Sequence, residues 1–409
     1  MNGTPINVLL IEDNPADARL IQELLREAED VVVRLTTADR LTTGLEMLQE
    51  QGADCVLLDL TLPDSSGFET FHTAHDEAPG VPFIILTHLD DAENALHIVQ
   101  EGAQDYLVKG DVDSRLLVRS IRYAIERKKA EEKVARYAEE LHVKNALLND
   151  DLNMAREVQQ ALLPQSYPTI SASAGDQHAV FDFCHRYRPS AAVGGDFFNI
   201  EAVGPHRAGV FICDVMGHGM RAALVTAIIR GLVEKQRPLA DNPGKFLTEI
   251  SRSLMAIFRQ TDQMMFASAF YYLADADNGV VRAANAGHPS PIYVSRRHRE
   301  IRPMFPEEVG HGPGLGLFGD AEYTTYEEHL EPEDFIVLYT DGLTEAEGEN
   351  GEEYGQDRLM ESIRNSLGLP SRAMLDKLCT DVDEFAVEGG VEDDICLVGM
   401  DVHELSPSG

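Results

Sequence analysis

The sequence predicts three parts: an α/β domain with a doubly wound, five-stranded parallel sheet, a long helical coiled-coil linker, and an α+β sandwich. Apolar runs alternate with amphipathic stretches over residues 1–126, and a heptad pattern without Gly or Pro occupies residues 127–163. Apolar runs then gather around helices over residues 164–403, and residues 404–409 form a tail that we expect to be disordered. At 409 residues the chain is too long for one ordinary core.

The first part contains five apolar runs of strand length. Amphipathic stretches, for example residues 16–28 and 41–49, lie between them. Strands that alternate with helices predict a parallel sheet, whose active site lies at the carboxyl ends of the strands. The five runs are Ile6–Ile11, Val31–Leu35, Cys55–Leu58, Phe83–Leu86 and Tyr106–Val108.

One continuous helix is expected from about Ile121 to Leu163, because this stretch contains neither Gly nor Pro. Apolar residues recur every seven positions along it, and a second, partly polar seam lies four residues after the first. This pattern predicts a dimeric coiled coil with weak pairing; the alternative is a lone helix that packs on its own domain. The first seam contains Val134, Leu141, Leu148, Ala155 and Leu162, and the second contains Ala138, Asn145, Leu152 and Gln159.

The third part is dominated by strand-like runs that do not alternate strictly with helices. This arrangement predicts largely antiparallel sheets in an α+β sandwich. The strand-like runs are Val180–Tyr187, Gly209–Val215, Phe266–Leu273, Val280–Ala284, Pro291–Val294, Phe335–Leu338 and Ile395–Met400, and the helical stretches are Arg221–Lys235, Lys245–Phe258 and Arg372–Phe385.

The composition argues against several classes of function. Seventy acidic residues against 34 basic ones give a formal charge of −36, which disfavours nucleic acid as a partner. No apolar run approaches the roughly 18 residues of a membrane helix, and no basic region precedes the first apolar run, so we expect a cytoplasmic protein without a secretory signal. The scattered cysteines are predicted to be buried, reduced thiols: Cys55, Cys184, Cys213, Cys379 and Cys396.

Residues that could bind a cation or react with a phosphoryl group follow four of the five predicted strands of the first part. Glu12 and Asp13 follow the first strand, Asp59 the third, Thr87 the fourth and Lys109 the fifth. Each alone would be an ordinary loop residue, but the carboxyl ends of parallel strands converge. Three carboxylates together would bind Mg²⁺. Asp59 would then be a nucleophile that forms an acyl phosphate, with Lys109 paired to the phosphoryl group.

With these residues, the segment 6–126 resembles the receiver domains of response regulators. The matching motifs are LLIEDNPADARLI, LLDLTLPDSSG, IILT and GAQDYLVKG. The resemblance implies phosphate transfer from a sensor histidine kinase or a phosphotransfer protein. It assigns Asp59 as the phosphoacceptor, Thr87, Tyr106 and Lys109 as switch residues, and Glu12, Asp13, Asp59 and the backbone carbonyl of Thr61 as Mg²⁺ ligands.

Two residues depart from the receiver pattern. His88 follows Thr87 where the family usually has Ala or Gly, and a bulky imidazole there would restrict access to Asp59. Gly110 follows Lys109 where the family usually has Pro, so the cis peptide common in that loop is not expected.

The third part carries four acidic landmarks. They are Asp196 in VGGDFF, Asp214 in ICDVMGHG, Asp341 in VLYTDGLTEA, and the pair Asp393–Asp394 in VEDDICLV. A lone Asp-Gly is a common turn, but four acids without a histidine ligand cluster favour two Mn²⁺ or Mg²⁺ ions. Such ions would activate a water for attack on a phosphate. His218 would donate a proton to the leaving oxygen, or else would be a capping or solvent-exposed imidazole.

Residues 155–400 resemble the metal-dependent protein phosphatases of the PPM type, in the branch of the stage II sporulation E and stress-sigma-factor phosphatases. The motifs are AREVQQALLP, VGGDFF, DVMGHGMRAALVTA, NAGHPSP, GLGLF, LYTDGLTEA and EDDICLV. The resemblance implies a serine/threonine phosphatase and a switch helix at the end of the linker. It implies Asp214 as the bridging ligand, with Asp196, Asp341, Asp393 and the backbone carbonyl of Val215 as further ligands; Asp394 is included as a candidate.

The resemblance also implies a substrate. Such phosphatases act on a small phosphorylated anti-anti-sigma protein with a STAS fold. A phosphorylation-gated adaptor without catalysis is the alternative, and the complete acid set argues against it. A DNA-binding response regulator is disfavoured by the negative charge.

Overall fold

The computed structural model describes residues 5–28, 31–88, 97–171, 179–259, 265–305, 311–387 and 389–403. The chain forms two compact units, Met1–Ala146 and Leu147–Gly409. The tail expected to be disordered, residues 404–409, lies outside the described residues.

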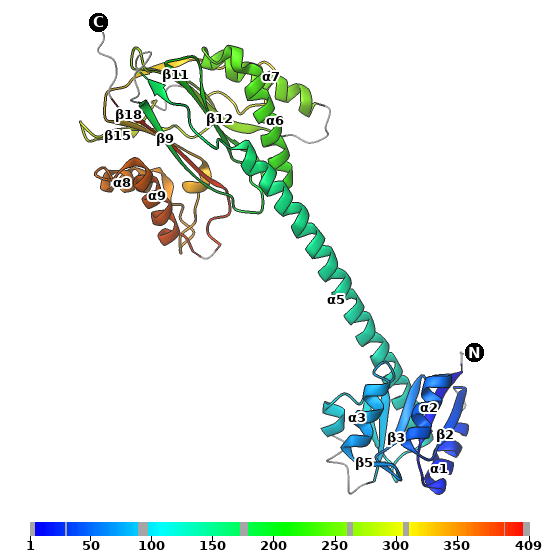
Figure 1. Ribbon diagram of the computed structural model, residues 1–409. Helices are drawn as coiled ribbons and strands as arrows, with labels where there is room; N and C mark the ends of the chain where they lie inside the picture. Colours follow the sequence, from blue (N-terminus) through cyan, green and yellow to red (C-terminus); the bar gives the residue numbers. More distant parts are fainter. Residues whose placement is uncertain are drawn as a thin grey trace. The chain divides into compact units, whose positions relative to one another are not determined.

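The first unit contains a sheet whose five strands all run parallel, in the order β2-β1-β3-β6-β7 (Figure 1). This confirms the doubly wound α/β class. The chain reverses its direction of winding between β1 and β3, and ligands bind at such a point. The strands are β1 (Ile6–Ile11), β2 (Val33–Ala38), β3 (Cys55–Asp59), β6 (Phe83–Thr87) and β7 (Asp105–Val108), a small hairpin is formed by β4 (Thr61–Leu62) and β5 (Ser65–Ser66), and the helices are α1 (Pro15–Arg26), α2 (Leu41–Gln51) and α3 (Phe68–Glu77).

Side chains of the central strands divide between two cores, because successive residues of a strand point to opposite faces. Leu9 and Leu58 belong to the core beneath α2 and α3. Leu10 and Leu57 belong to the core beneath α1 and the start of α5 (Ser114–Leu162). All five residues of β3 are buried, as expected for a strand covered on both faces.

Helix α5 is continuous over 49 residues and confirms the long helix expected from the sequence. It begins earlier than about Ile121, because Asp113 caps it by accepting the backbone N–H of Leu116 at 2.7 Å. Its first turns bury Leu117 and Ile121 in the core of the first unit. Neither α5 nor another helix within the described ranges is long and apolar enough to cross a membrane.

The middle of α5 exposes a row of apolar side chains. Val134, Leu141 and Leu148, from the first predicted seam, are 67%, 60% and 57% exposed. Tyr137 and Leu147 are exposed as well. A second helix in a coiled coil would cover such a row. Pairing of two chains through this helix stays a prediction.

The second predicted seam does not extend to Gln159. This side chain is buried against the second unit: its Nε2 donates to the carbonyl of Gly194 at 2.7 Å, and its Oε1 accepts the N–H of Gly194 at 3.0 Å. The assignment of Gln159 to a coiled-coil position is therefore wrong. Heptad spacing identifies a helix face that is buried, but does not identify what covers it.

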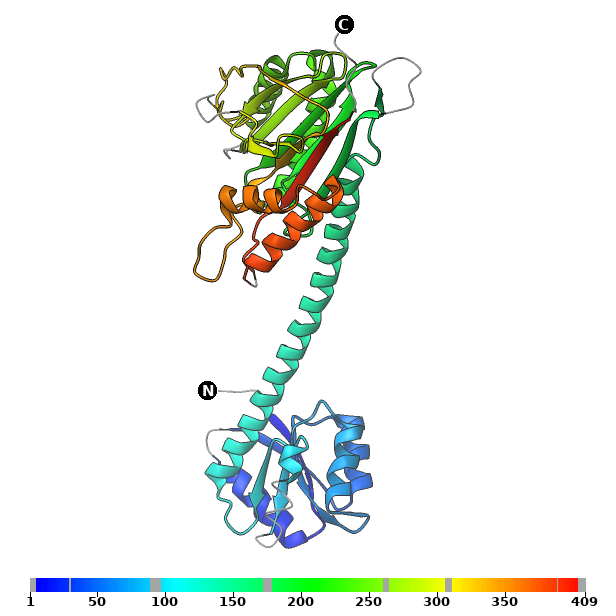
Figure 2. The same cartoon turned by 90° about the vertical axis from the view of Figure 1, so that its left-hand side faces the viewer.

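The second unit is a sandwich of two antiparallel sheets, which confirms the predicted α+β class (Figures 1 and 2). The sheet orders are β10-β11-β12-β13-β16 and β15-β14-β17-β18-β9-β8. Helices α6 (Met220–Gln236) and α7 (Pro243–Phe258) cover the first sheet, and α8 (Gly355–Asn365) and α9 (Ser371–Phe385) cover the second. The remaining elements are β8 (Ile170–Ser171), β9 (Ala179–Arg188), β10 (Phe197–Ala202), β11 (Arg207–Val215), β12 (Ala267–Asp275), β13 (Val280–Ala286), β14 (Ile292–Ser295), β15 (Glu300–Pro303), β16 (Tyr326–His329), β17 (Asp334–Tyr339), β18 (Ile395–Val402) and the short 3₁₀ turns η2 (Arg237–Leu239) and η3 (Asp341–Leu343).

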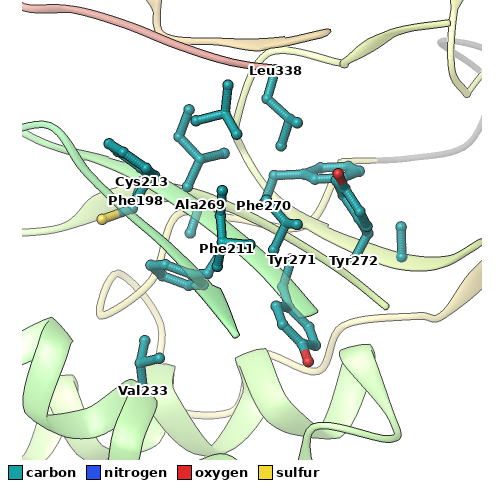
Figure 3. Packing of buried hydrophobic residues seen from close by; sticks show 14 of the residues in the cluster. Phe198, Phe211, Cys213, Val233, Ala269, Phe270, Tyr271, Tyr272 and Leu338 are labelled. Carbon is teal, nitrogen blue, oxygen red and sulfur yellow. The ribbon is translucent and has the colours of Figure 1, made fainter. Parts of the chain in front are cut away.

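Strand β12 is buried on both faces, as two consecutive tyrosines show. The hydroxyl of Tyr271 donates to the carbonyl of Ala240 on the helical side, at 3.1 Å. The hydroxyl of Tyr272 lies 3.4 Å from the sulfur of Met400, in β18 of the opposite sheet. Figure 3 shows both rings among the apolar side chains that fill this core. The core thus fixes the spacing of the two sheets whose ends carry the acids.

All five cysteines are free thiols. Cys55, Cys184, Cys213 and Cys396 are buried, and Cys379 is half-buried. Burial raises the pKa of Cys184 to about 12. A thiol that stays protonated is a poor nucleophile, so these residues contribute packing, as expected.

Candidate functional site

Three carboxylates of the first unit meet at the carboxyl edge of its sheet. Glu12 and Asp13 follow β1, Asp59 ends β3, and these strands are neighbours in which Ile11 pairs with Leu58. One oxygen atom from each of the three carboxylates lies within 4.8 Å of the others. Closely spaced oxygen ligands suit Mg²⁺. The residues therefore fit the cation predicted for this edge.

Lys109 supplies the positive charge of this site. Its Nζ lies 2.7 Å from Asp59 Oδ2 and 2.6 Å from Glu12 Oε2. A third carboxylate, Asp17, lies 3.3 Å away and was not anticipated from the sequence. Burial opposes the charge on Lys109, but the carboxylates of Asp59 and Glu12 raise its pKa. Burial raises the pKa of Glu12 to about 7, against the opposing hydrogen bond from Lys109.

The other predicted receiver residues surround Asp59. Thr61 donates its backbone N–H to Asp59 Oδ1 at 3.1 Å. Thr87 ends β6 with a buried side chain, and its hydroxyl donates to the carbonyl of His88 at 3.2 Å. Tyr106 lies in β7 and packs, partly buried, against the core beneath α2 and α3. The hydroxyl of Thr87 thus lies in β6 and the ring of Tyr106 lies in β7, the two strands on one side of β3.

His88 stands at the wall of the pocket that contains Asp59. The pocket is also lined by Thr61, Phe68 and Thr87. The imidazole of His88 is exposed, and restricted access to Asp59 because of this residue stays a prediction. No peptide bond among the described residues is cis.

The predicted metal acids of the second unit lie at matching ends of neighbouring strands. Asp196 precedes β10 and Asp214 lies near the end of β11, its antiparallel neighbour. Asp341 follows β17, and Asp393 and Asp394 precede β18, the antiparallel neighbour of β17. The end of one strand meets the start of the next in an antiparallel pair. Each sheet therefore contributes one pair of acidic positions.

The acids of both sheets are close enough to alter one another's titration. Burial, followed by the charges of Asp341 and Asp393, raises the pKa of Asp214 to about 7. Burial and the charge of Asp214 raise the pKa of Asp196 well above its usual range. Burial and the charge of Asp393 also raise the pKa of Asp341. Mutual repulsion in an all-oxygen donor set is relieved by a hard divalent cation, so these residues fit Mn²⁺ or Mg²⁺.

Thr340 joins the two sheets beneath the acids. Its buried hydroxyl donates to Asp196 Oδ2 at 2.7 Å and accepts the backbone N–H of Cys396 at 2.9 Å. Thr340 was not among the residues predicted from the sequence, although a hydroxyl directly before Asp341 at the end of a buried strand was an available signal. Thr340 is thus a positioning residue for Asp196.

Thr340→Val should lower activity roughly tenfold, because Asp196 loses its hydrogen bond and Cys396 N–H loses its acceptor, at about 1–3 kcal/mol for a buried unsatisfied group. Steady-state hydrolysis of a phosphoserine peptide would measure this. Thr340→Ser keeps the hydroxyl and should restore most of the rate. Equal losses in both variants would indicate a packing effect of the methyl group instead.

Asp394 shapes the loop that carries Asp196. Its Oδ1 accepts the backbone N–H of Ser190 at 2.7 Å, and its Oδ2 accepts the N–H of Gly195. A Cβ atom at Gly194 would stand 2.2 Å from Oδ2, so only glycine fits there. With both oxygens of Asp394 engaged, Asp393 has the freer carboxylate of the predicted pair.

Val215 is the last residue of β11, and His218 lies in the loop that follows. The N–H of Val215 donates to the carbonyl of Gly195 at 3.3 Å, which connects the end of β11 to the loop that carries Asp196. His218 is exposed and forms no hydrogen bond with the residues that the structure describes. The N-cap of α6 is Gly219, without a side-chain cap. An imidazole free of protein partners remains available for proton transfer, and this role stays a prediction.

The last turns of α5 contact the loop that carries Asp196. Arg156 Nε donates to the carbonyl of Ala192 at 2.8 Å, and Gln159 forms its two hydrogen bonds with Gly194. Arg156 and Gln159 are three residues apart, so they share one helix face. This contact was not predicted from the sequence, because the heptad spacing placed Gln159 in a coiled-coil seam. The helix thus contacts the loop that positions Asp196.

Two family models match the chain. The response regulator receiver domain matches residues 8–122, and stage II sporulation protein E matches residues 204–403. The phosphoserine phosphatase RsbP of Bacillus subtilis is 24% identical over 254 residues, which cover 61% of this chain and 59% of that protein. The phosphoserine phosphatase RsbU of the same species is 28% identical over 204 residues, which cover 50% of this chain and 56% of that protein. The chain thus spans less than two thirds of the length of these relatives.

A solved structure has a fold similar to that of the second unit. The PP2C domain of SiaA from Pseudomonas aeruginosa superposes with a TM-score of 0.53 at 22% identity, covering 63% of this chain and 98% of that one. This likeness agrees with the sandwich fold described above. Residues 8–122 of the chain therefore belong to the response regulator receiver domain family, and residues 204–403 belong to the stage II sporulation protein E family.

Proposed function

We propose that the second unit removes phosphate from a phosphoserine or phosphothreonine of a protein, and that the receiver controls this reaction. The observation that supports it best is the convergence of Asp196, Asp214, Asp341 and Asp393, since the charges of neighbouring acids raise the pKa values of the first three. Similarity to RsbP and RsbU, both named phosphoserine phosphatases, supports the substrate chemistry.

Two Mn²⁺ or Mg²⁺ ions at this site would supply charge neutralisation for the phosphate and an activated water for in-line attack. Asp214 would bridge the ions, and the further ligands would be Asp196, Asp341, Asp393 and the carbonyl of Val215. Thr340 and Asp394 hold Asp196 in place through the contacts already described. His218 would donate a proton to the leaving serine or threonine oxygen.

The test is hydrolysis of a phosphoserine peptide by the full chain with Mn²⁺, compared with the same reaction in a chelator. Release of phosphate only with the cation is the expected result. Binding of a phosphoprotein without release of phosphate would instead favour the phosphorylation-gated adaptor.

We further propose that the protein substrate is a STAS-domain anti-anti-sigma protein. Support comes only from the family resemblance and the similarity to RsbP and RsbU. Incubating the full chain with the phosphorylated STAS proteins of its own genome, with and without acetyl phosphate, would identify the substrate and the direction of control. Activation by receiver phosphorylation is the expected direction.

Asp59→Asn should abolish the response of phosphatase activity to acetyl phosphate. Asp59 is the carboxylate that Lys109 contacts at 2.7 Å, beside two further acids, so it is the expected phosphoacceptor for a histidine kinase or phosphotransfer protein. Mass spectrometry should detect one added phosphoryl group in the wild-type chain and none in the variant. Failure of wild type to bind acetyl phosphate or beryllofluoride at high Mg²⁺ would mean that His88 blocks the pocket.

Helix α5 is the proposed carrier of the signal. Salt screens charges beyond roughly 8–10 Å, so a phosphate on Asp59 needs a mechanical element to influence another unit. Helix α5 belongs to both units, exposes an apolar row, and ends on the loop next to Asp196. Receiver phosphorylation would change how two chains pair along this helix.

Asn145→Leu should strengthen that pairing and make activity insensitive to acetyl phosphate, because a polar core position weakens a coiled coil. Light scattering would report the dimer, and the peptide assay would report the response. Asn153→Leu, at an exposed position outside both seams, is the matched control. A wild-type chain that stays monomeric with and without acetyl phosphate would rule out this mechanism.

A further inference from the structure

A groove of about 620 Å³ begins at Asp341 and extends away from the other metal acids. Its walls come from the segment after β13 and from the segment between β17 and α8. The side chains that matter here are His288, Ser290, Tyr339, Asp341, Glu345 and Glu353. The groove includes part of the NAGHPSP motif, whose residues have no role in the proposed reaction.

His288 lines this groove, and its buried Nε2 has no hydrogen-bond partner of ordinary geometry among the residues that the structure describes. The residue is 2% exposed, and its Nδ1 lies 2.8 Å from the hydroxyl of Ser268. Its backbone is fixed by Asn285, whose Oδ1 accepts the N–H of His288 at 2.8 Å. The carbonyl of Tyr339 lies near enough to favour the protonated ring, but no hydrogen bond of ordinary geometry forms to Nε2. A buried polar atom without a partner is costly, so Nε2 indicates a ligand.

The protonation of His288 determines what that ligand must offer. Burial lowers the pKa of His288 to about 3, so the ring is neutral. If Nδ1 accepts from Ser268, the proton is on Nε2, which then needs an acceptor. The hydroxyl of Ser290, also buried without a partner, can donate or accept. Such groups suit the alternating carbonyl and N–H groups of an extended peptide.

Glu345 and Glu353 give the groove a negative wall. Both side chains are exposed enough to meet a ligand. Glu345, Glu353 and Asp341 line the same groove, so their negative charges repel one another. No lysine or arginine lines the groove among the described residues. A cationic side chain from outside would relieve this repulsion.

We propose that this groove holds the polypeptide segment next to the phosphorylated residue, with His288 and Ser290 bonded to its backbone and Glu345 and Glu353 bonded to a lysine or arginine. The proposal rests on the proposed function, because the groove starts at Asp341 and its occupant is part of the phosphatase substrate. It assigns the enzyme a preference for phosphoserine segments that carry a nearby positive charge.

The test compares phosphoserine peptides in which one arginine is moved through the positions on each side of the phosphoserine, with alanine and glutamate at the same positions. For the full chain with Mn²⁺, arginine at one position should raise kcat/KM roughly fivefold over alanine through a lower KM, the size expected for a partly exposed ion pair. The Glu345→Gln/Glu353→Gln variant should bring this ratio to about one. Glu353→Lys should make glutamate the preferred residue.

Glu361→Gln is the matched control, because Glu361 is exposed on α8 and does not line the groove; it should keep the arginine preference. Hydrolysis of all peptides at equal rates would overturn this inference and leave the proposed function standing. Variants that keep the preference but need more Mn²⁺ would also overturn it, since the two glutamates would then serve a cation. Hydrolysis of no peptide at any Mn²⁺ concentration would overturn the proposed function itself.

Discussion

Asp341→Asn should lower kcat by about a thousandfold or more, which corresponds to roughly 4 kcal/mol of lost transition-state stabilisation at a metal-dependent site. The variant loses one anionic oxygen next to Asp214 and Asp393, so a cation position empties or distorts. Its fold should persist. The raised pKa of Asp341 means that its charge is unfavourable in the metal-free fold, so removing the charge at neutral pH costs no stability.

Two measurements check the Asp341→Asn prediction. Peptide hydrolysis across a Mn²⁺ titration should show the loss of rate at every concentration. Thermal unfolding should show that Mn²⁺ stabilises the variant less than wild type. Asp357→Asn, an exposed acid in the first turn of α8, should behave like wild type in both assays. Activity within a few-fold of wild type at saturating Mn²⁺ would remove Asp341 from the site.

Gln159→Leu should lower activity about 10- to 100-fold and raise the Mn²⁺ concentration needed. Leucine cannot replace the two hydrogen bonds to Gly194, so a buried N–H and a buried carbonyl lose their partner at about 1–3 kcal/mol each. The loop that carries Asp196 would then occupy several conformations.

Gln160→Leu is the matched control for that variant, because Gln160 is its exposed neighbour on the same helix. It should retain activity and metal requirement. If both substitutions had the same effect, the cause would be a general property of an apolar helix end. If Gln159→Leu were as active as wild type, the contact with Gly194 would have no part in holding the site.

The parallel sheet of the receiver and the positions of Glu12, Asp13, Asp59, Thr87 and Lys109 at its edge could be predicted from the sequence, because these five residues follow apolar runs. The parallel order then brings Glu12, Asp59 and Lys109 together without further information. Asp17 escaped notice because it lies in the first turn of a helix, where an acid is ordinary.

The sandwich was predicted less completely. Strands β8, β10, β15 and β16 and helix α8 were not expected. Strand β16 reads YEEH, with alternate half-buried and exposed positions, so its sequence carries little apolar signal. Helix α8 is polar overall and buries only Leu359, Ser362 and Ile363. In both elements tertiary packing, rather than local propensity, determines the structure.

The candidate metal acids were visible as motifs, but their supports were not. Asp394 meets Ser190 across 204 positions of sequence, and Thr340 meets Asp196 across 144. Contacts at such separation leave no periodic signal. For Gln159 the periodic signal was present, and its partner was identified wrongly.

The border between the receiver unit and the unit that carries the candidate metal acids lies inside helix α5. A recombinant fragment cut at Pro164 would lack Arg156 and Gln159, and would lose Leu163 from the core of the sandwich. Such a fragment should aggregate or lack activity even though every metal acid is present. A fragment that starts near Leu147, where the second compact unit begins, keeps these residues and should retain the proposed phosphatase activity.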